Sequence, residues 1–266
     1  MSIETLKEEI FKITKNMNLG ESYSQELAYK IFVEHAYKAI LQAWVQVNKG
    51  FGTSFYVDDS WKTTPVKDLD LDLVEKAVIT YMNMVKESEP FTDILSMVHE
   101  EILLTGRRGE RLGQFLTPPD LANLLSELVM TDEDIRSMDK VKTLSEPCCG
   151  SGSMILAPLA RMAKVDRSKV RYVQVMLNDI DTLMCKVATL QVVASSMMHA
   201  IKFNSLMVYN CNLLTGWSKE NTLMVGLMPM IDEDSAEMIE LFILFNQYLS
   251  EQSKRREVKE MELEQA

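Results

Sequence analysis

Residues 146–153, with the sequence EPCCGSGS, constrain the fold more than any other part of this chain. They follow a short apolar stretch, 141–144, and lead directly into the apolar run 154–157. This order predicts a β-strand, a glycine turn and the start of a helix. Two glycines let the backbone turn sharply and approach a ligand closely, and the free N–H groups of a helix start face that ligand. One such turn is weak evidence of function on its own.

The turn belongs to an alternation of strands and helices. After the first strand, three more are expected at about 170–177, 206–209 and 222–227, with a buried helix over 181–200. Such alternation predicts a parallel α/β sheet. The fourth strand would have an open edge that needs a cover, either a final helix over 236–251 or another subunit.

The first ~105 residues show helical periodicity instead. Helices are expected over 3–17, from 22 to about 50, over 70–86 and over 92–104, with a loop over 51–65. The chain then divides into a helical N-terminal domain (1–112), a ligand-binding domain (113–231), and a C-terminal helix with a charged tail (232–266).

Charge and composition exclude several classes of protein. The net charge of −11 argues against tight binding of nucleic acid without a partner protein, because DNA-binding proteins normally carry a basic face. Dense basic stretches occur only near 107–111 and 254–256, where they indicate either a local phosphate contact or a solvated loop and helix end. The four cysteines lack C-x-x-C spacing and the three histidines are far apart, so no metal site is expected.

The same features predict a location. Cysteines without a disulfide pattern favour a reducing compartment, and therefore the cytoplasm. No apolar stretch is long enough to span a bilayer, and the N-terminus does not resemble a signal peptide. We expect no membrane association.

Three polar segments fall at predicted strand ends. They are the turn 146–153, the acidic segment 178–181 and the segment 210–212. Open α/β sheets bind ligands at the carboxyl ends of their strands. A carboxylate at the second position suits a ribose diol, and the short polar side chains at the third suit a nucleobase edge. Together they predict a ligand that contains a nucleoside.

The segment 113–118 (GQFLTP) adds a family resemblance. With the turn 146–153 and the acidic strand end 177–181, it resembles the adenine-N6 DNA methyltransferases, specifically the modification subunits of type I restriction-modification systems. Those proteins carry G-Q-[FY]-x-T-P, then D-P-x-C-G-S-G, then an acidic strand end, after a helical region. The resemblance covers roughly residues 1–230. It implies a class I, Rossmann-like methyltransferase sheet, shortened, with an N-terminal helical domain.

The resemblance implies an S-adenosylmethionine pocket. Phe115 and Thr117 would line the methionine end, with Glu146 near the amino group, and Asp179 would hold the ribose hydroxyls. The remaining cofactor-binding positions would be the rest of the turn and a residue near the adenine amino group: Pro147, Gly150, Ser151, Gly152 and Asn212.

One expected element is missing. The family's catalytic segment is [ND]-P-P-[FYW], whose first residue accepts hydrogen bonds from the target amino group and whose aromatic stacks on the flipped base. The chain contains no N-P-P or D-P-P. By alignment with the fourth strand, the segment falls at Leu227, Met228, Pro229 and Met230, so no catalytic residue is assigned. A full methyltransferase sheet has further strands after the fourth, so the resemblance implies a truncated sheet.

Two functions remain open. The first is an adenine-N6 DNA methyltransferase whose DNA recognition comes from a specificity-type subunit. The second is a catalytically inactive, degenerate methyltransferase that acts as a binding, regulatory or anti-restriction subunit. Both imply a protein partner or a homo-oligomer. A third interpretation, cofactor cleavage, rests only on the acidic residues 232–234, which read more simply as a solvated turn.

Overall fold

The fold was analysed in a computed structural model that describes residues 2–48, 53–104, 116–216 and 222–228. The N-terminal region contains α1 (Ile3–Lys12), α2 (Glu21–Asn48), β1 (Ser54–Val57), the short helix η1 (Asp59–Trp61) and α3 (Leu71–Glu87), followed by α4 (Leu95–His99) and the π-helix η2 (Glu100–Leu104). The expected helices are present, but α1 is shorter than predicted and the loop over 51–65 contains a strand.

The second region carries the alternation that the sequence predicts. Its elements are α6 (Pro119–Val129), α7 (Asp132–Arg136), β2 (Lys142–Glu146), α8 (Ser153–Asp166), η3 (Arg167–Tyr172), β3 (Val173–Asp179), α9 (Thr182–Met198), β4 (Ser205–Asn210), α10 (Leu213–Gly216) and β5 (Leu223–Met228). Helix α6 begins directly after Pro118, with Pro119 as its first residue. The α/β fold class is confirmed.

The sheet is mixed, with the strand order β1-β5-β4-β3-β2. Strands β2, β3 and β4 are parallel, as predicted. Strand β5 runs antiparallel to β4, so the prediction of a parallel fourth strand is wrong. A parallel return needs a long crossover, usually through a helix that spans the strand. The link 211–222 is short and its described helix, α10, has 4 residues, so the chain folds back beside β4 instead.

The outer edge of β5 is covered by a segment that the sequence suggested was a loop. Strand β1 pairs antiparallel with β5, from Ser54 opposite Met228 to Val57 opposite Val225. The N-terminal region therefore contributes a strand to the sheet, and the open edge expected there does not exist. The helix predicted over 236–251 lies outside the described residues.

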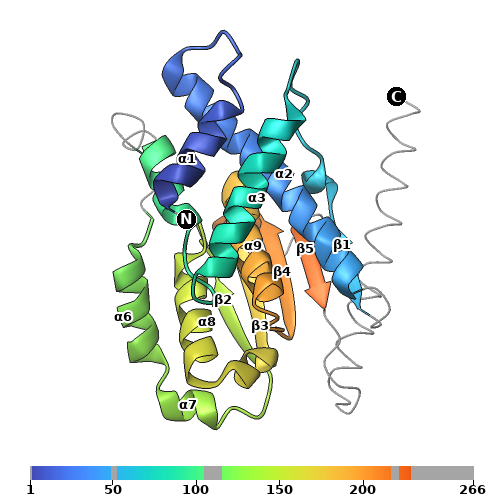
Figure 1. The fold of residues 1–266 in the computed structure, drawn as a ribbon. Helices are drawn as coiled ribbons and strands as arrows, with labels where there is room; N and C mark the ends of the chain where they lie inside the picture. The colour runs from blue at the N-terminus through green and yellow to red at the C-terminus, as the bar shows by residue number, and fades with distance from the viewer. Residues whose placement is uncertain (1, 49–52, 105–115, 217–221, 229–266) are drawn as a thin grey trace, which may run out of the picture.

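Helices α8 and α9 lie on one face of the sheet, because both crossovers advance in the same direction, from β2 to β3 to β4. Helix α2 packs beside α9, and α3 packs against both (Figure 1). Buried apolar residues of the helical region and of the sheet form one continuous cluster. The proposed boundary between residues 112 and 113 falls outside the described part of the chain.

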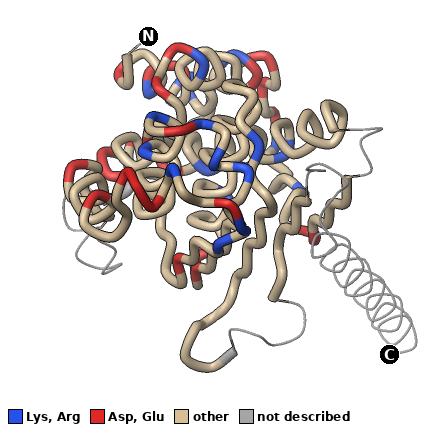
Figure 2. Tube along the Cα trace, turned by 90° about the horizontal axis from the view of Figure 1, so that it is seen from below, with Lys and Arg blue, Asp and Glu red and all other residues tan. Residues whose placement is uncertain are grey.

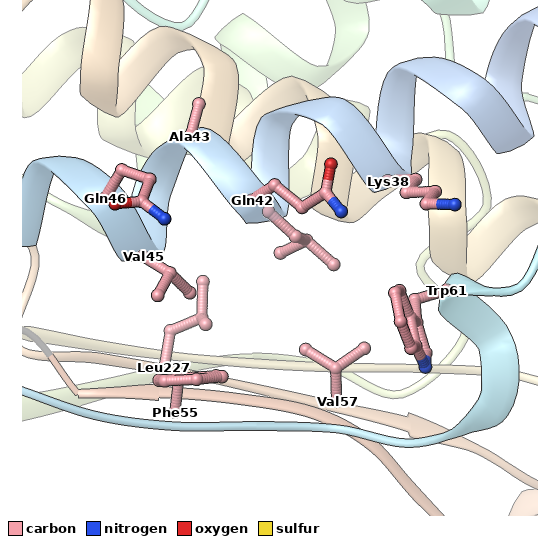
Figure 3. A pocket seen from close by; sticks show the side chains of 10 residues that line it. Lys38, Gln42, Ala43, Val45, Gln46, Phe55, Val57, Trp61 and Leu227 are labelled. Carbon is pink, nitrogen blue, oxygen red and sulfur yellow. The ribbon is translucent and has the colours of Figure 1, made fainter.

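A hollow of about 640 Å³ separates the middle of α2 from the antiparallel strands. Leu227, Phe55 and Val57 line its floor and Val45 its roof, and all four face the same space in Figure 3. At its rim, the Lys38 ammonium lies 5.4 Å from the centre of the Trp61 ring. This hollow involves neither the glycine turn nor the ends of the parallel strands. No helix within the described ranges is long and apolar enough to cross a membrane.

Candidate cofactor site at the strand ends

The carboxyl ends of β2, β3 and β4 are held together by one buried amide. Asn178, 1% exposed, lies near the end of β3. Its Nδ2 donates to the carbonyl oxygens of Pro147 (2.9 Å) and Cys211 (3.1 Å), and its Oδ1 accepts from the Cys211 N–H (3.2 Å). Asn178 therefore fixes the segments that follow β2 and β4 relative to β3, at the edge where parallel sheets bind ligands.

The turn between β2 and α8 requires glycine at two positions. Gly150 and Gly152 have φ angles of +50° and +99°. A Cβ on Gly152 would lie 3.2 Å from the Ala188 Cβ and 3.3 Å from its Cα, so the turn packs directly on α9. Gly152 is also the N-cap of α8. Free backbone N–H groups and the positive end of the α8 dipole thus face the strand ends, where an anionic group is favoured.

Asp179, the last residue of β3, is joined to this turn. Its Oδ2 accepts a hydrogen bond from the Gly150 N–H (2.9 Å), and its Oδ1 accepts one from the Asp181 N–H (2.9 Å). The carboxylate is only partly buried, so it keeps lone pairs for a ligand. The next side chain, Ile180, is 68% exposed and offers an apolar surface beside it.

Glu146 lies at the end of β2 and is half-buried. Burial raises the pKa of its carboxyl group, the nearby Asp179 carboxylate raises it further, and the Cys148 N–H lowers it. Two carboxylates on one side of the turn favour a ligand that carries positive charge there, because a cation offsets their mutual repulsion.

The segment before α6 reaches the same turn. A Cβ on Gly150 would lie 3.2 Å from the Cδ2 of Leu116, so Leu116 sits against the glycine turn. Thr117, its neighbour, is partly buried. The structure therefore brings the start of the 116–118 segment to the turn, while Phe115 lies outside the described residues.

The end of β4 contributes side chains that are mostly engaged in hydrogen bonds within the fold. Asn212 is exposed, and its Oδ1 accepts a hydrogen bond from the Leu214 N–H (2.9 Å) at the start of α10. Asn210, the first residue of the polar segment 210–212, donates from Nδ2 to the Asp179 carbonyl oxygen (2.9 Å). Its Oδ1 accepts from the Thr182 hydroxyl (2.9 Å), so it joins β4 to the start of α9.

A network of buried hydrogen bonds centred on Gln191 holds the glycine turn in place. Gln191 in α9 donates from Nε2 to the Ser151 carbonyl oxygen (2.9 Å) and to Asp93 Oδ1 (2.8 Å). Its Oε1 accepts from the N–H groups of Ile94 and Leu95 (2.9 Å each). The Ser153 hydroxyl donates to Asp93 as well. This network ties the N-terminal region to the glycine turn.

The segment aligned with the catalytic motif lies elsewhere. Because β5 is antiparallel, its carboxyl end points away from the glycine turn, and Leu227 pairs with Leu206 near the beginning of β4. The expectation that Leu227 and Met228 occupy the catalytic position beside the cofactor is therefore wrong. Pro229 and Met230 lie outside the described residues. Within the described ranges, no group of His, Cys, Asp or Glu side chains is arranged to hold a metal ion.

Comparison with known proteins gives one match. The family model described as N-6 DNA methylase matches residues 91–238, more than half of the chain. This range includes Asp93, the glycine turn, Asp179 and Asn212. No curated protein matches the chain.

Proposed function

The chain belongs to the N-6 DNA methylase family, and we propose that it binds S-adenosylmethionine at the carboxyl ends of β2, β3 and β4, as an adenine-N6 DNA methyltransferase-like protein of the type I modification-subunit kind. The observation that carries the proposal is the hydrogen bond from the Gly150 N–H to Asp179, which places a carboxylate beside a glycine turn at a helix start. Dinucleotide-binding folds use the same combination to hold a ribose and an anionic group.

The residues fit this cofactor in chemical type. Asp179 has free lone pairs for the two ribose hydroxyls, and the exposed Ile180 provides an apolar surface for the adenine ring. Glu146 attracts the ammonium or sulfonium group, which would reverse the upward shift of its pKa. The helix start at Gly152 suits the carboxylate. When bound, S-adenosylmethionine supplies an electrophilic methyl group.

A second function is favoured by the position of β5. The sequence has no N-P-P or D-P-P, and the strand aligned with that motif points to the opposite end of the sheet. The carboxamide or carboxylate that such a motif would offer to a target amino group is therefore missing from the described residues near the turn. The alternative is a catalytically inactive, degenerate methyltransferase that acts as a binding, regulatory or anti-restriction subunit.

A methylation assay separates the two functions. The full chain, with and without a candidate specificity subunit, is incubated with tritiated S-adenosylmethionine and mixed-sequence DNA. Label in DNA that resists protease supports the methyltransferase. Cofactor binding without DNA labelling in any combination supports the inactive alternative.

A protein partner is part of the proposal, and one surface of the second region supports it. Among the described strands, β2 pairs with β3 alone, which leaves its other edge open. Helix α6 packs against α8 on that side and lies beyond the edge in Figure 1. The side chains of Leu121, Leu124 and Leu128 form a stripe on α6 and are 46%, 53% and 72% exposed. Such an apolar stripe beside an open strand edge favours a partner that contributes a β-strand, and we propose the specificity-type subunit that recognises DNA.

The partner proposal is tested with Leu124→Asp, which places a charge in the stripe. Loss of co-purification with a specificity-type subunit, at unchanged thermal stability, is expected. Retained co-purification would refute this surface as the docking site.

A further inference from the structure

A second cavity, of about 850 Å³, lies between α6, the carboxyl-terminal half of α8 and the segment 86–90. Its lining includes four basic side chains, Lys86, Arg161, Lys164 and Arg167, and two acidic ones, Glu89 and Glu127. The excess of positive charge contrasts with the chain's net charge of −11. Figure 2, seen from below, shows Lys and Arg segments interspersed with Asp and Glu segments over the described part.

Most of these cations are not used within the fold. Lys86, Lys164 and Arg167 are exposed, and no ion pair of theirs occurs among the described residues. The position of Lys164 in the last turn of α8 is favourable for the helix dipole, which accounts for one of them. Lys86 likewise lies in the last turn of α3, whereas Arg161 lies a turn earlier in α8 and pairs with Asp132.

Two buried polar atoms at the cavity also have no partner in the described part of the chain. Ser126 is only 7% exposed, and its hydroxyl makes no hydrogen bond. Arg161 pairs through Nη2 with Asp132 (2.7 Å), but its buried Nε has no acceptor. Buried polar groups without partners are rare, because their desolvation is not repaid. Both residues line the cavity, so a polar ligand bound there would lie next to them.

The lining indicates the class of ligand. It contains lysine, arginine, serine, asparagine and histidine side chains, which are typical phosphate and sugar contacts, but no Phe, Tyr or Trp ring among the described residues on which a base could stack. From the last turns of α8 to the first residue of η3, residues 161, 164 and 167 recur every third position and span about 9 Å. That span covers two or three phosphates at about 3.4 Å of axial rise per nucleotide.

We propose that this cavity binds phosphate groups of a nucleic-acid strand without reading its bases. Lys164 follows Ser153 at the start of α8 by about 16 Å of helix, so the cavity is separate from the cofactor site. Binding here does not depend on S-adenosylmethionine or on methyl transfer. Calorimetry with the cofactor therefore reports on the proposed function, and the experiment below reports on the cavity.

The test is fluorescence anisotropy of the full chain with a labelled 12-nucleotide single strand of mixed sequence, at 50 to 200 mM salt. The variant is Lys164→Ala with Arg167→Ala. The matched control is Lys15→Ala with Lys67→Ala, which removes the same charge at exposed lysines away from the cavity. We expect the cavity variant to bind at least tenfold more weakly, with a salt slope reduced by about 1 to 2. The control should stay within twofold of the parent.

A second variant, Ser126→Ala, removes the hydroxyl without changing charge and should weaken binding severalfold at an unchanged salt slope. Competition with adenosine monophosphate and inorganic phosphate distinguishes the sources of phosphate. Displacement at millimolar concentration with no preference for the strand identifies a free anion as the ligand and supports the site. Equal weakening by the cavity variant and the control, or no binding of the strand or of either anion, overturns the proposal.

Discussion

Replacing Gly152 with alanine tests the geometry of the turn. The φ angle of +99° is costly for any residue with a Cβ, by about 1–3 kcal/mol. The new Cβ would also lie 3.2 Å from the Ala188 Cβ and 3.3 Å from its Cα. The Cα belongs to the backbone of α9 and cannot move aside cheaply, so overpacking adds about 1–3 kcal/mol. We expect Gly152→Ala to lower the free energy of unfolding by about 2–6 kcal/mol.

Urea unfolding monitored by circular dichroism measures this loss, provided that the transition is two-state. The matched control is Gly20→Ala, because a Cβ on Gly20 meets no atom within 4 Å and that residue has no positive φ. The control should change stability by less than about 1 kcal/mol. Adding Ala188→Gly should recover only part of the loss, since the contact with the Cα remains. A Gly152→Ala protein as stable as the parent would refute the described turn.

Three further predictions follow from the buried groups. Gln191→Leu should cost about 2–4 kcal/mol in urea unfolding, because Asp93, the Ser151 carbonyl and two N–H groups lose their partner; a loss below 1 kcal/mol would contradict the network. Burial lowers the pKa of His99 to about 4 from 6.5, so the unfolded chain takes up a proton first, and stability should fall as pH drops from 6.5 to 4, by up to about 3 kcal/mol. His99→Phe should remove that dependence, and an unchanged pH profile would refute it. Burial raises the pKa of Glu146 above its unfolded value of 4.5, so ionisation of this carboxyl group costs more in the folded chain than in the unfolded one. The free energy of unfolding of Glu146→Gln should therefore increase relative to that of the parent as the pH rises above 4.5. A difference between the two proteins that does not change with pH would contradict this prediction.

Sequence reasoning located the parallel part of the sheet and the residues of its carboxyl edge. It succeeded where the signal is local, as in the apolar strand, paired glycines and helix start around Gly150, or in the acidic end of β3. It failed at β1, whose 4 residues carry little periodicity and whose partner strand comes far later in the chain. The pairing of two strands that are so far apart in the chain cannot be recognised from the sequence pattern of either strand alone.

The direction of β5 was also missed, and here a signal existed. The short link 211–222 does not favour a helical crossover, yet the alternation of strands and helices led us to predict a parallel strand. That error placed Leu227 beside the cofactor, whereas it lies at the other end of the sheet. The roles of Asn178 and Gln191 depend on three-dimensional contacts between strand ends and helices, which single-sequence patterns do not report.

The central claim is that the edge formed by the glycine turn and Asp179 binds S-adenosylmethionine, and titration calorimetry of the full chain tests it most directly. We predict binding of one cofactor per chain, weakened at least tenfold by Asp179→Asn, which removes the negative charge but keeps the side-chain shape. The same titration with Lys15→Ala serves as the control and should match the parent. The absence of any binding heat at millimolar cofactor, together with no shift in thermal unfolding, would contradict the account.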